Sequence, residues 1–170
     1  MPIHENNTFC IPYQGKPPIV GTYDTPATAM PRGIGVYKNG TTILESDSGT
    51  IPEGFLNTEV TTDGPDYEEL MHISTDSVII HENKVSEGKV QVYAYSPGDY
   101  YVMRGNVKSG TTFAAGEIVY MAADGEFTDD AVADVGDIKL GIVTEIGVTF
   151  EGVTDCIVWQ AVAGLGTKTA

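Results

Sequence analysis

Apolar residues along the chain gather in short runs of about four to nine positions, bounded by Gly, Pro, Asp and Ser. The runs are rich in Val, Ile, Tyr and Phe, which favour strands, and they are too short for core helices. A strand about every eight to twelve residues is typical of all-β proteins, so we predict a small antiparallel β-barrel or sandwich. The clearest runs lie at 77–81, 89–95, 100–104, 118–121, 138–145 and 154–162.

The dipeptide Asn39-Gly40 is the strongest short-range hairpin signal in the sequence. Asn and Gly tolerate the positive φ angles that the central positions of a two-residue loop require. Such a hairpin would pair Val36 with Ile43 across the turn.

A second hairpin is predicted at Asp124-Gly125 for the same reason. A two-residue loop at this dipeptide would place Ala122 opposite Phe127. The polar stretch 46–65 is predicted to be a long surface loop, interrupted by a short strand at 55–60.

The sequence Asp63-Gly64-Pro65 and the acidic residues that follow favour a short helix ending near His72. Proline suits the first position of a helix, and carboxylates suit its N-terminus. The predicted fold is therefore all-β with at most one short helix.

The strand predicted at 154–162 is apolar on both faces. Successive side chains of a strand point to opposite sides, so this strand must be covered on both. The cover would come from the N-terminal half of the protein or from another polypeptide. One face would carry Ile157, Trp159 and Ala161, and the other Cys156, Val158 and Gln160.

Residues 1–32 hold six of the nine prolines, so they cannot form a helix or a central strand. We predict an extended arm here, followed by a hairpin and loop segment at 33–76 and the main β-domain at 77–170. The arm is too apolar for a disordered tail. It would pack over its own barrel or reach across a neighbouring subunit. Its candidate anchors for capsid or intersubunit contact are Phe9, Ile11, Tyr13, Ile19 and Tyr23.

The protein is strongly acidic, with 24 Asp and Glu against 9 Lys and Arg and a formal net charge of −15. This charge disfavours nucleic acid and anionic membranes as partners. Two cysteines, Cys10 and Cys156, are too few for a disulfide framework and are predicted to be free thiols. No stretch resembles a secretory signal or reaches membrane-spanning length, so synthesis in a cytosol is expected.

No arrangement of residues predicts a catalytic, cofactor or metal site. His4, His72 and His81 lack the spacing that places two ligands on one metal, and no nucleophile motif or phosphate loop is present. The acidic run at 124–137 fails the calcium-loop pattern, because the sixth position is Asp129 and the twelfth is Val135. A looser calcium site stays open there, with a solvated loop as the plainer interpretation.

The C-terminal half resembles the small β-domain of tailed-bacteriophage capsid decoration (cement) proteins, over roughly residues 90–163. The resemblance lies in the order of turns and strands, without a catalytic signature. It is carried by the turn Ala114–Glu117, the strand 118–121, the turn Asp124–Thr128, the acidic spacer, the strand 139–145 and the final strand Gly152–Gln160.

This resemblance implies a non-enzymatic virion protein that binds the outer surface of an icosahedral capsid and stabilises it. Its partners would be the major capsid protein and itself, as a homotrimer. It would be made in the host cytoplasm and reside on the capsid exterior. An acidic surface and an apolar arm suit that role, since weak contacts repeated around a symmetric shell add up.

Two other classes of function are alternatives. A tail-associated or surface-associated glycan-binding module would use a platform of tyrosines, although tyrosines more often pack in cores and interfaces. An enzyme of the trimeric β class is disfavoured, because no acid, base or metal constellation is present. The platform would consist of Tyr93, Tyr95, Tyr100 and Tyr101.

Overall fold

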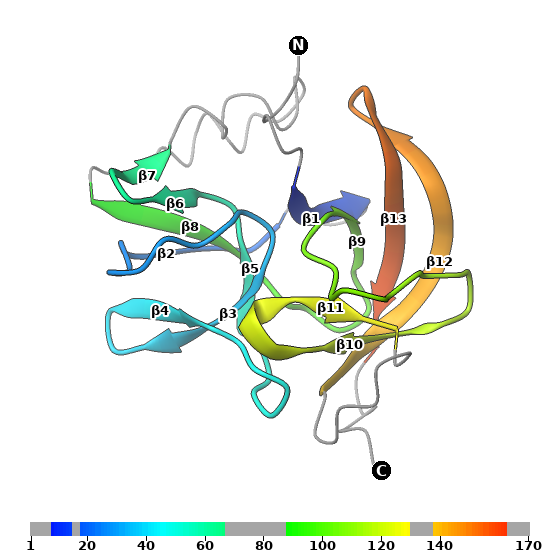
Figure 1. Ribbon diagram of the computed structural model, residues 1–170, viewed down its shortest axis with the longest axis horizontal. Helices are drawn as coiled ribbons and strands as arrows, with labels where there is room; N and C mark the ends of the chain where they lie inside the picture. The colour runs from blue at the N-terminus through cyan, green and yellow to red at the C-terminus, as the bar shows by residue number, and fades with distance from the viewer. Residues whose placement is uncertain (1–7, 15–17, 67–87, 130–137, 163–170) are drawn as a thin grey trace.

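The computed structural model describes residues 8–14, 18–66, 88–129 and 138–162 (Figure 1). These residues form antiparallel strands and one short 3-10 turn, η2 (Ala123–Gly125). The predicted all-β fold is confirmed. Figure 1 shows two sheets side by side, with the long curved hairpin of β12 and β13 along one side of the molecule.

The larger sheet curls back on itself. Gly105 and Asn106 have positive φ angles and turn the backbone after β9, so that Val107 bridges to Phe127 of β11. The Lys108 amide then donates to the Phe127 carbonyl over 2.8 Å. We call the resulting curled sheet the first barrel. Its strand order is β1 (Phe9–Gln14), β9 (Tyr100–Arg104), β13 (Val153–Ala161), β12 (Ile138–Phe150), β10 (Ile118–Met121) and β11 (Phe127–Thr128).

The smaller sheet also closes at one end, where its two edge strands meet. The Asp24 amide donates to the Thr41 carbonyl over 2.8 Å, and the Thr42 hydroxyl donates to the Asp24 carbonyl over 2.9 Å. We call this junction the seam and the sheet the second barrel. Its order is β2 (Val20–Asp24), β8 (Lys89–Ala94), β5 (Gly54–Leu56), β3 (Gly35–Asn39) and β4 (Thr42–Glu45), with β6 (Glu59–Thr61) and β7 (Gly64–Asp66) paired separately.

Phe55 joins the two barrels. Its strand, β5, belongs to the second barrel, and the neighbouring Leu56 faces that barrel's own core. The Phe55 ring points the other way and packs in the core of the first barrel, in a cluster of aromatic rings. Its ring centroid lies 6.2 Å from Tyr95, 5.2 Å from Tyr101, 5.8 Å from Phe127 and 5.7 Å from Trp159.

The sequence predicted that the final strand carries apolar residues on both faces and is covered on both, and this is confirmed in β13. Trp159 and Ala161 face the core of the first barrel, whereas Cys156 and Val158 face a separate apolar cluster. The N-terminal half of the same polypeptide contributes to that cluster through Phe9 and Ile11. The curved hairpin also reaches back, since the ring of Phe150 near its tip lies 6.0 Å from that of Phe9.

The described part of residues 1–32 is built into both barrels. Strand β1 pairs with β9 and lies at the edge of the first sheet, and β2 pairs with β8 at the edge of the second. Edge positions suit this segment, because Pro12 cannot donate a ladder hydrogen bond. Of the two alternatives for the predicted arm, packing over its own barrel describes these residues. The described parts of the sequence segments 1–32, 33–76 and 77–170 are therefore interleaved within the two sheets.

Both predicted hairpins form with a different register. In the first, Asn39 pairs with Thr42, so the two-residue turn is Gly40-Thr41, and Gly40 has a φ of 65°. Val36 consequently faces Glu45 instead of Ile43. Hydrogen bonds of the seam hold the residues at this turn and explain the shift.

In the second hairpin, Phe127 pairs with Met121 instead of Ala122. The loop is widened because the Gly125 amide donates to the Ser46 carbonyl of the other barrel over 2.6 Å. The positive φ angles that the sequence predicted at Asp124 and Gly125 are present, at 57° and 70°.

Two further predictions need correction. The single strand expected at 55–60 is two strands, β5 and β6, in different sheets. The start of the expected helix is strand β7 instead, in which Pro65 pairs with Val60. Cross-strand pairing from Gly64, with a φ of 113°, excludes a helix there. The remainder of that helix and the strand predicted at 77–81 lie outside the described residues.

Candidate functional site

The five candidate contact residues differ in how far solvent reaches them. Phe9 and Ile11 are buried in the protein's own core, with 1% and 4% of their surface exposed. Both therefore need a correction, because the folded protein cannot offer them to a capsid or a neighbouring subunit. Tyr13 and Tyr23 are half-buried, and Ile19 is 69% exposed.

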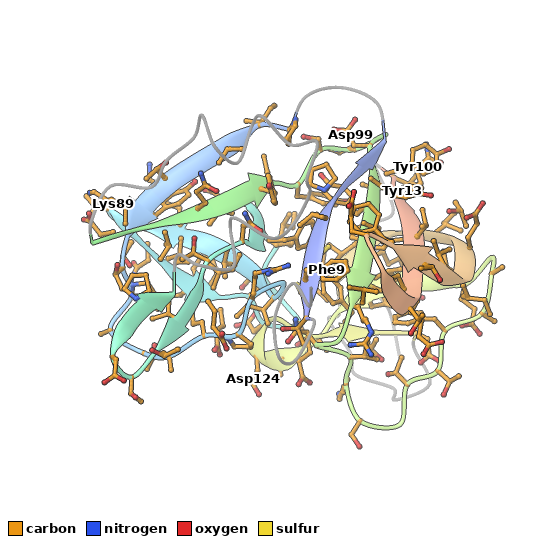
Figure 2. The ribbon with its side chains drawn as sticks, turned by 90° about the horizontal axis from the view of Figure 1, so that it is seen from above. Phe9, Tyr13, Lys89, Asp99, Tyr100 and Asp124 are labelled. Atoms are coloured by element: carbon orange, nitrogen blue, oxygen red, sulfur yellow. The ribbon has the colours of Figure 1, made fainter. Side chains whose placement is uncertain are left out.

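Two of these residues, Tyr13 and Ile19, lie at one end of the two sheets. Gln14 at the end of β1 pairs with Tyr100 at the start of β9. The Ile19 carbonyl accepts a hydrogen bond from Ala94, at the end of β8 and just before the turn that leads to Tyr100. Figure 2 shows Tyr13 and Tyr100 close together beside Asp99. We call Tyr13, Ile19, Asp99 and Tyr100 the rim.

Hydrogen bonds hold the backbone of the turn that leads to Tyr100. Pro97 and Gly98, with a Gly98 φ of 95°, form a tight turn that the Asp99 amide closes onto the Ser96 carbonyl over 3.1 Å. The Tyr101 hydroxyl accepts from the Ser96 amide and donates to a β8 carbonyl. The Gly98 amide donates to the end of β13 over 2.6 Å. The exposed Tyr100 ring, 37% exposed, therefore projects from fixed backbone.

The tyrosines of the predicted glycan platform do not share a surface. Tyr93 and Tyr101 are buried at 4% and 1% exposure. Tyr95 is half-buried, and its hydroxyl donates to the Leu140 carbonyl over 2.6 Å. Burial raises the pKa of Tyr93 to about 12. Only Tyr100 among the four presents its ring to solvent.

A group of carboxylates lies where the two barrels meet. Gly125 of η2 contacts the other barrel through Ser46, and Glu45 precedes Ser46 at the end of β4. Partial burial, and then the charges of Asp124 and Glu126, raise the pKa of Glu45. Partial burial and the charge of Asp124 likewise raise the pKa of Glu126. These carboxylates repel one another across the junction.

The protein has a buried cation that sequence reasoning missed. Arg32 is fully buried, and its guanidinium carbon lies 5.6 Å from the centroid of the Phe9 ring. Burial lowers its pKa to about 10, so it remains charged at neutral pH. The Asn106 side chain donates to the Arg32 carbonyl over 2.7 Å. Arg32, which precedes β3 of the second barrel, thus packs against β1 of the first barrel, and no local pattern marks it as different from a surface arginine.

The described part of the protein contains no group of side chains that could hold a metal ion, and it includes none of the three histidines. No group of three or more His, Cys, Asp or Glu side chains among these residues is placed to hold a metal ion. His4, His72, His81 and the 130–137 part of the possible calcium loop lie outside the described residues. Both cysteines are buried free thiols, as predicted.

No protein-family model matches the sequence, and no curated protein sequence matches it. Among the described residues, no helix is long and apolar enough to cross a membrane.

Proposed function

We propose that this protein is a non-enzymatic structural component of a virion, which binds the outer surface of an icosahedral capsid through the rim. Its partners are the major capsid protein and further copies of itself, as a homotrimer, with no role for nucleic acid or membrane. It is made in the host cytoplasm and then resides on the capsid exterior. The order of turns and strands that resembles capsid decoration proteins supports this assignment.

The observation that carries the proposal is the exposure of Ile19 and Tyr100 at one end of the two sheets, with Tyr100 next to a hydrogen-bonded turn. Backbone that is hydrogen-bonded before binding loses less conformational entropy on binding, and large exposed apolar side chains supply contact area. A net charge of −15 favours the outside of a shell over its DNA-filled interior.

The expected loss of capsid affinity can be estimated from the apolar side-chain surface that binding would bury. Covering one large aliphatic or aromatic side chain contributes about 2 kcal/mol. Its loss therefore weakens each contact by about thirtyfold. Repetition of the contact within a trimer multiplies that loss.

A paired-variant experiment tests the rim. The double substitution Ile19→Ser with Tyr100→Ser removes the exposed apolar groups of the rim. The matched control, Ile51→Ser with Ile146→Ser, removes two exposed isoleucines elsewhere on the surface. Each protein is mixed with expanded capsids of tailed phages, and bound copies are counted after sedimentation.

We expect the rim variant to lose capsid occupancy and the control to keep it. Equal occupancy for both variants would contradict the assignment of the rim. A wild-type protein that binds sugars on a glycan array, and no capsid, would favour the glycan-binding alternative. Solution mass of the unbound protein checks the trimer separately.

A further inference from the structure

The tip of the β3–β4 hairpin combines an asparagine with a glycine in open surroundings. Asn39 and Gly40 are both exposed, and a Cβ added at Gly40 would meet no atom within 4 Å. Among the described residues, the Asn39 side chain and the Gly40 amide make no hydrogen bond. No neighbouring side chain therefore shields the Gly40 nitrogen from the amide carbonyl of the Asn39 side chain.

The other two asparagines of the described residues are protected. Asn57 is fully buried, and its side-chain amide points to Gln91 at 3.4 Å. The Asn106 side chain donates to a backbone carbonyl over 2.7 Å. Both precede a β-branched residue, Thr58 or Val107, whose side chain crowds the following backbone nitrogen.

We propose that Asn39 is a site of spontaneous modification, which converts it to aspartate and isoaspartate and thereby loosens the seam of the second barrel. The Gly40 backbone nitrogen forms a bond to the Asn39 Cγ, and the bond between Cγ and Nδ2 of Asn39 breaks. The proton of the Gly40 amide leaves with the departing nitrogen as ammonia. Water then opens the five-membered imide at either carbonyl, which gives the two acids without any oxidant or reductant.

The consequence follows from the position of the hairpin tip. Asn39 pairs with Thr42, and Thr41 and Thr42 hold the two hydrogen bonds to Asp24 that close the seam. Isoaspartate places an extra carbon in the backbone at residue 39. The pairing with Thr42 is then displaced, and the contacts with Asp24 are displaced with it.

The rate at which Asn39 is converted depends on how often its pair with Thr42 opens. An extended Asn39 must first leave its pair with Thr42, and terminal pairs of a hairpin open readily. If that pair is open about a tenth of the time, the reaction runs roughly tenfold slower than in an unstructured peptide. The rate remains far above that at the two protected asparagines.

The experiment ages the full-length protein in mildly alkaline buffer beside a free peptide of residues 34–44. Isoaspartate is located by mass spectrometry of fragments, and amide hydrogen exchange is measured at Asp24. The control variant is Asn39→Gln, whose longer side chain does not form the five-membered ring. We expect isoaspartate at residue 39, none at Asn57 or Asn106, and faster exchange at Asp24 in the aged wild type alone.

Two results would overturn the proposal. The site is refuted if residue 39 is unchanged when most of the free peptide has converted. The effect on the seam is refuted if isoaspartate forms but Asp24 exchanges as slowly as it does in the aged glutamine variant. A second variant, Asn39→Asp, measured before ageing, introduces the charge with a normal backbone, so it should leave exchange at Asp24 unchanged.

Discussion

Removal of the Phe55 ring should uncouple the two barrels. Phe55 is completely buried and has four aromatic neighbours with ring centroids 5.2 to 6.2 Å away. Substitution of a buried Phe by Ala costs about 3 to 5 kcal/mol, and edge-on aromatic pairs add to the loss. Three of the four pairs are edge-on, with interplanar angles of 88°, 73° and 85°. We therefore expect Phe55→Ala to lower the free energy of unfolding by about 4 kcal/mol.

This loss is large against the whole stability of a domain, which is about 5 to 15 kcal/mol. For a protein of this length it corresponds to a fall in Tm of about 12 °C. The cavity also removes the aromatic side-chain link that Phe55 makes between the barrels. Urea unfolding should therefore separate into two transitions, one reported by Trp159 fluorescence in the first barrel and the other by far-UV circular dichroism.

The assay has a natural reporter, because Trp159 is the single tryptophan of the protein and its ring lies 5.7 Å from that of Phe55. The control is Phe113→Ala, a buried Phe of the same core that belongs to the first barrel itself. It should destabilise the protein without separating the two transitions. Coincident transitions in Phe55→Ala, or a loss below about 1 kcal/mol, would refute the linking role of Phe55.

Two further substitutions test other parts of the structure. Glu45→Gln should stabilise the protein at neutral pH by less than about 1 kcal/mol, because solvent screens this half-buried group. A carboxyl with a raised folded pKa destabilises the fold when ionised, so the advantage over wild type should shrink as pH falls through the raised pKa towards the ordinary value. Thermal unfolding of both proteins across that range checks the sign, and a growing advantage at low pH would contradict it. Gly141→Ala should cost about 3 kcal/mol or more, since its Cβ would overlap the Gln160 carbonyl oxygen on the paired strand; urea unfolding measures this, and a neutral effect would count against the register of β12 and β13.

Much of the strand content follows from local pattern. Alternation in β8 places Val90 and Val92 in one core and Tyr93 in another cluster, as the period of two in the sequence predicts. The turns could also be predicted from the local sequence, since the positive φ angles at Gly40 and Asp124 coincide with the predicted hairpins. These features depend on neighbouring residues alone, which a sequence displays directly.

Pairing between distant strands could not be predicted in the same way. Strand β1 pairs with β9, about ninety residues further along the sequence, and nothing in either strand specifies the other. For the same reason, composition could not tell whether Phe9 and Ile11 serve the protein's own core or a partner. The loop at Gly125 likewise widens because of a distant carbonyl, that of Ser46.

The candidate site was only partly foreseeable. Ile19 stands out in the sequence as an apolar residue in a proline-rich segment, and its side chain is 69% exposed. Tyr100 was predicted only as part of a glycan platform. Its neighbours in that group differ from it in burial, which depends on the curl of the sheet. Arg32 was missed because a buried arginine and a surface arginine look alike in a sequence.

The edge position of β1 bears on how the protein reaches its native state during translation. The second barrel needs no strand beyond β8, which ends at Ala94, so it can close while the rest of the polypeptide is still being made. Strand β1 must wait for β9, and the first barrel must wait for β13. Apolar Phe9 and Ile11 are consequently exposed during that interval on the ribosome, where chaperone binding or slower elongation would most affect yield.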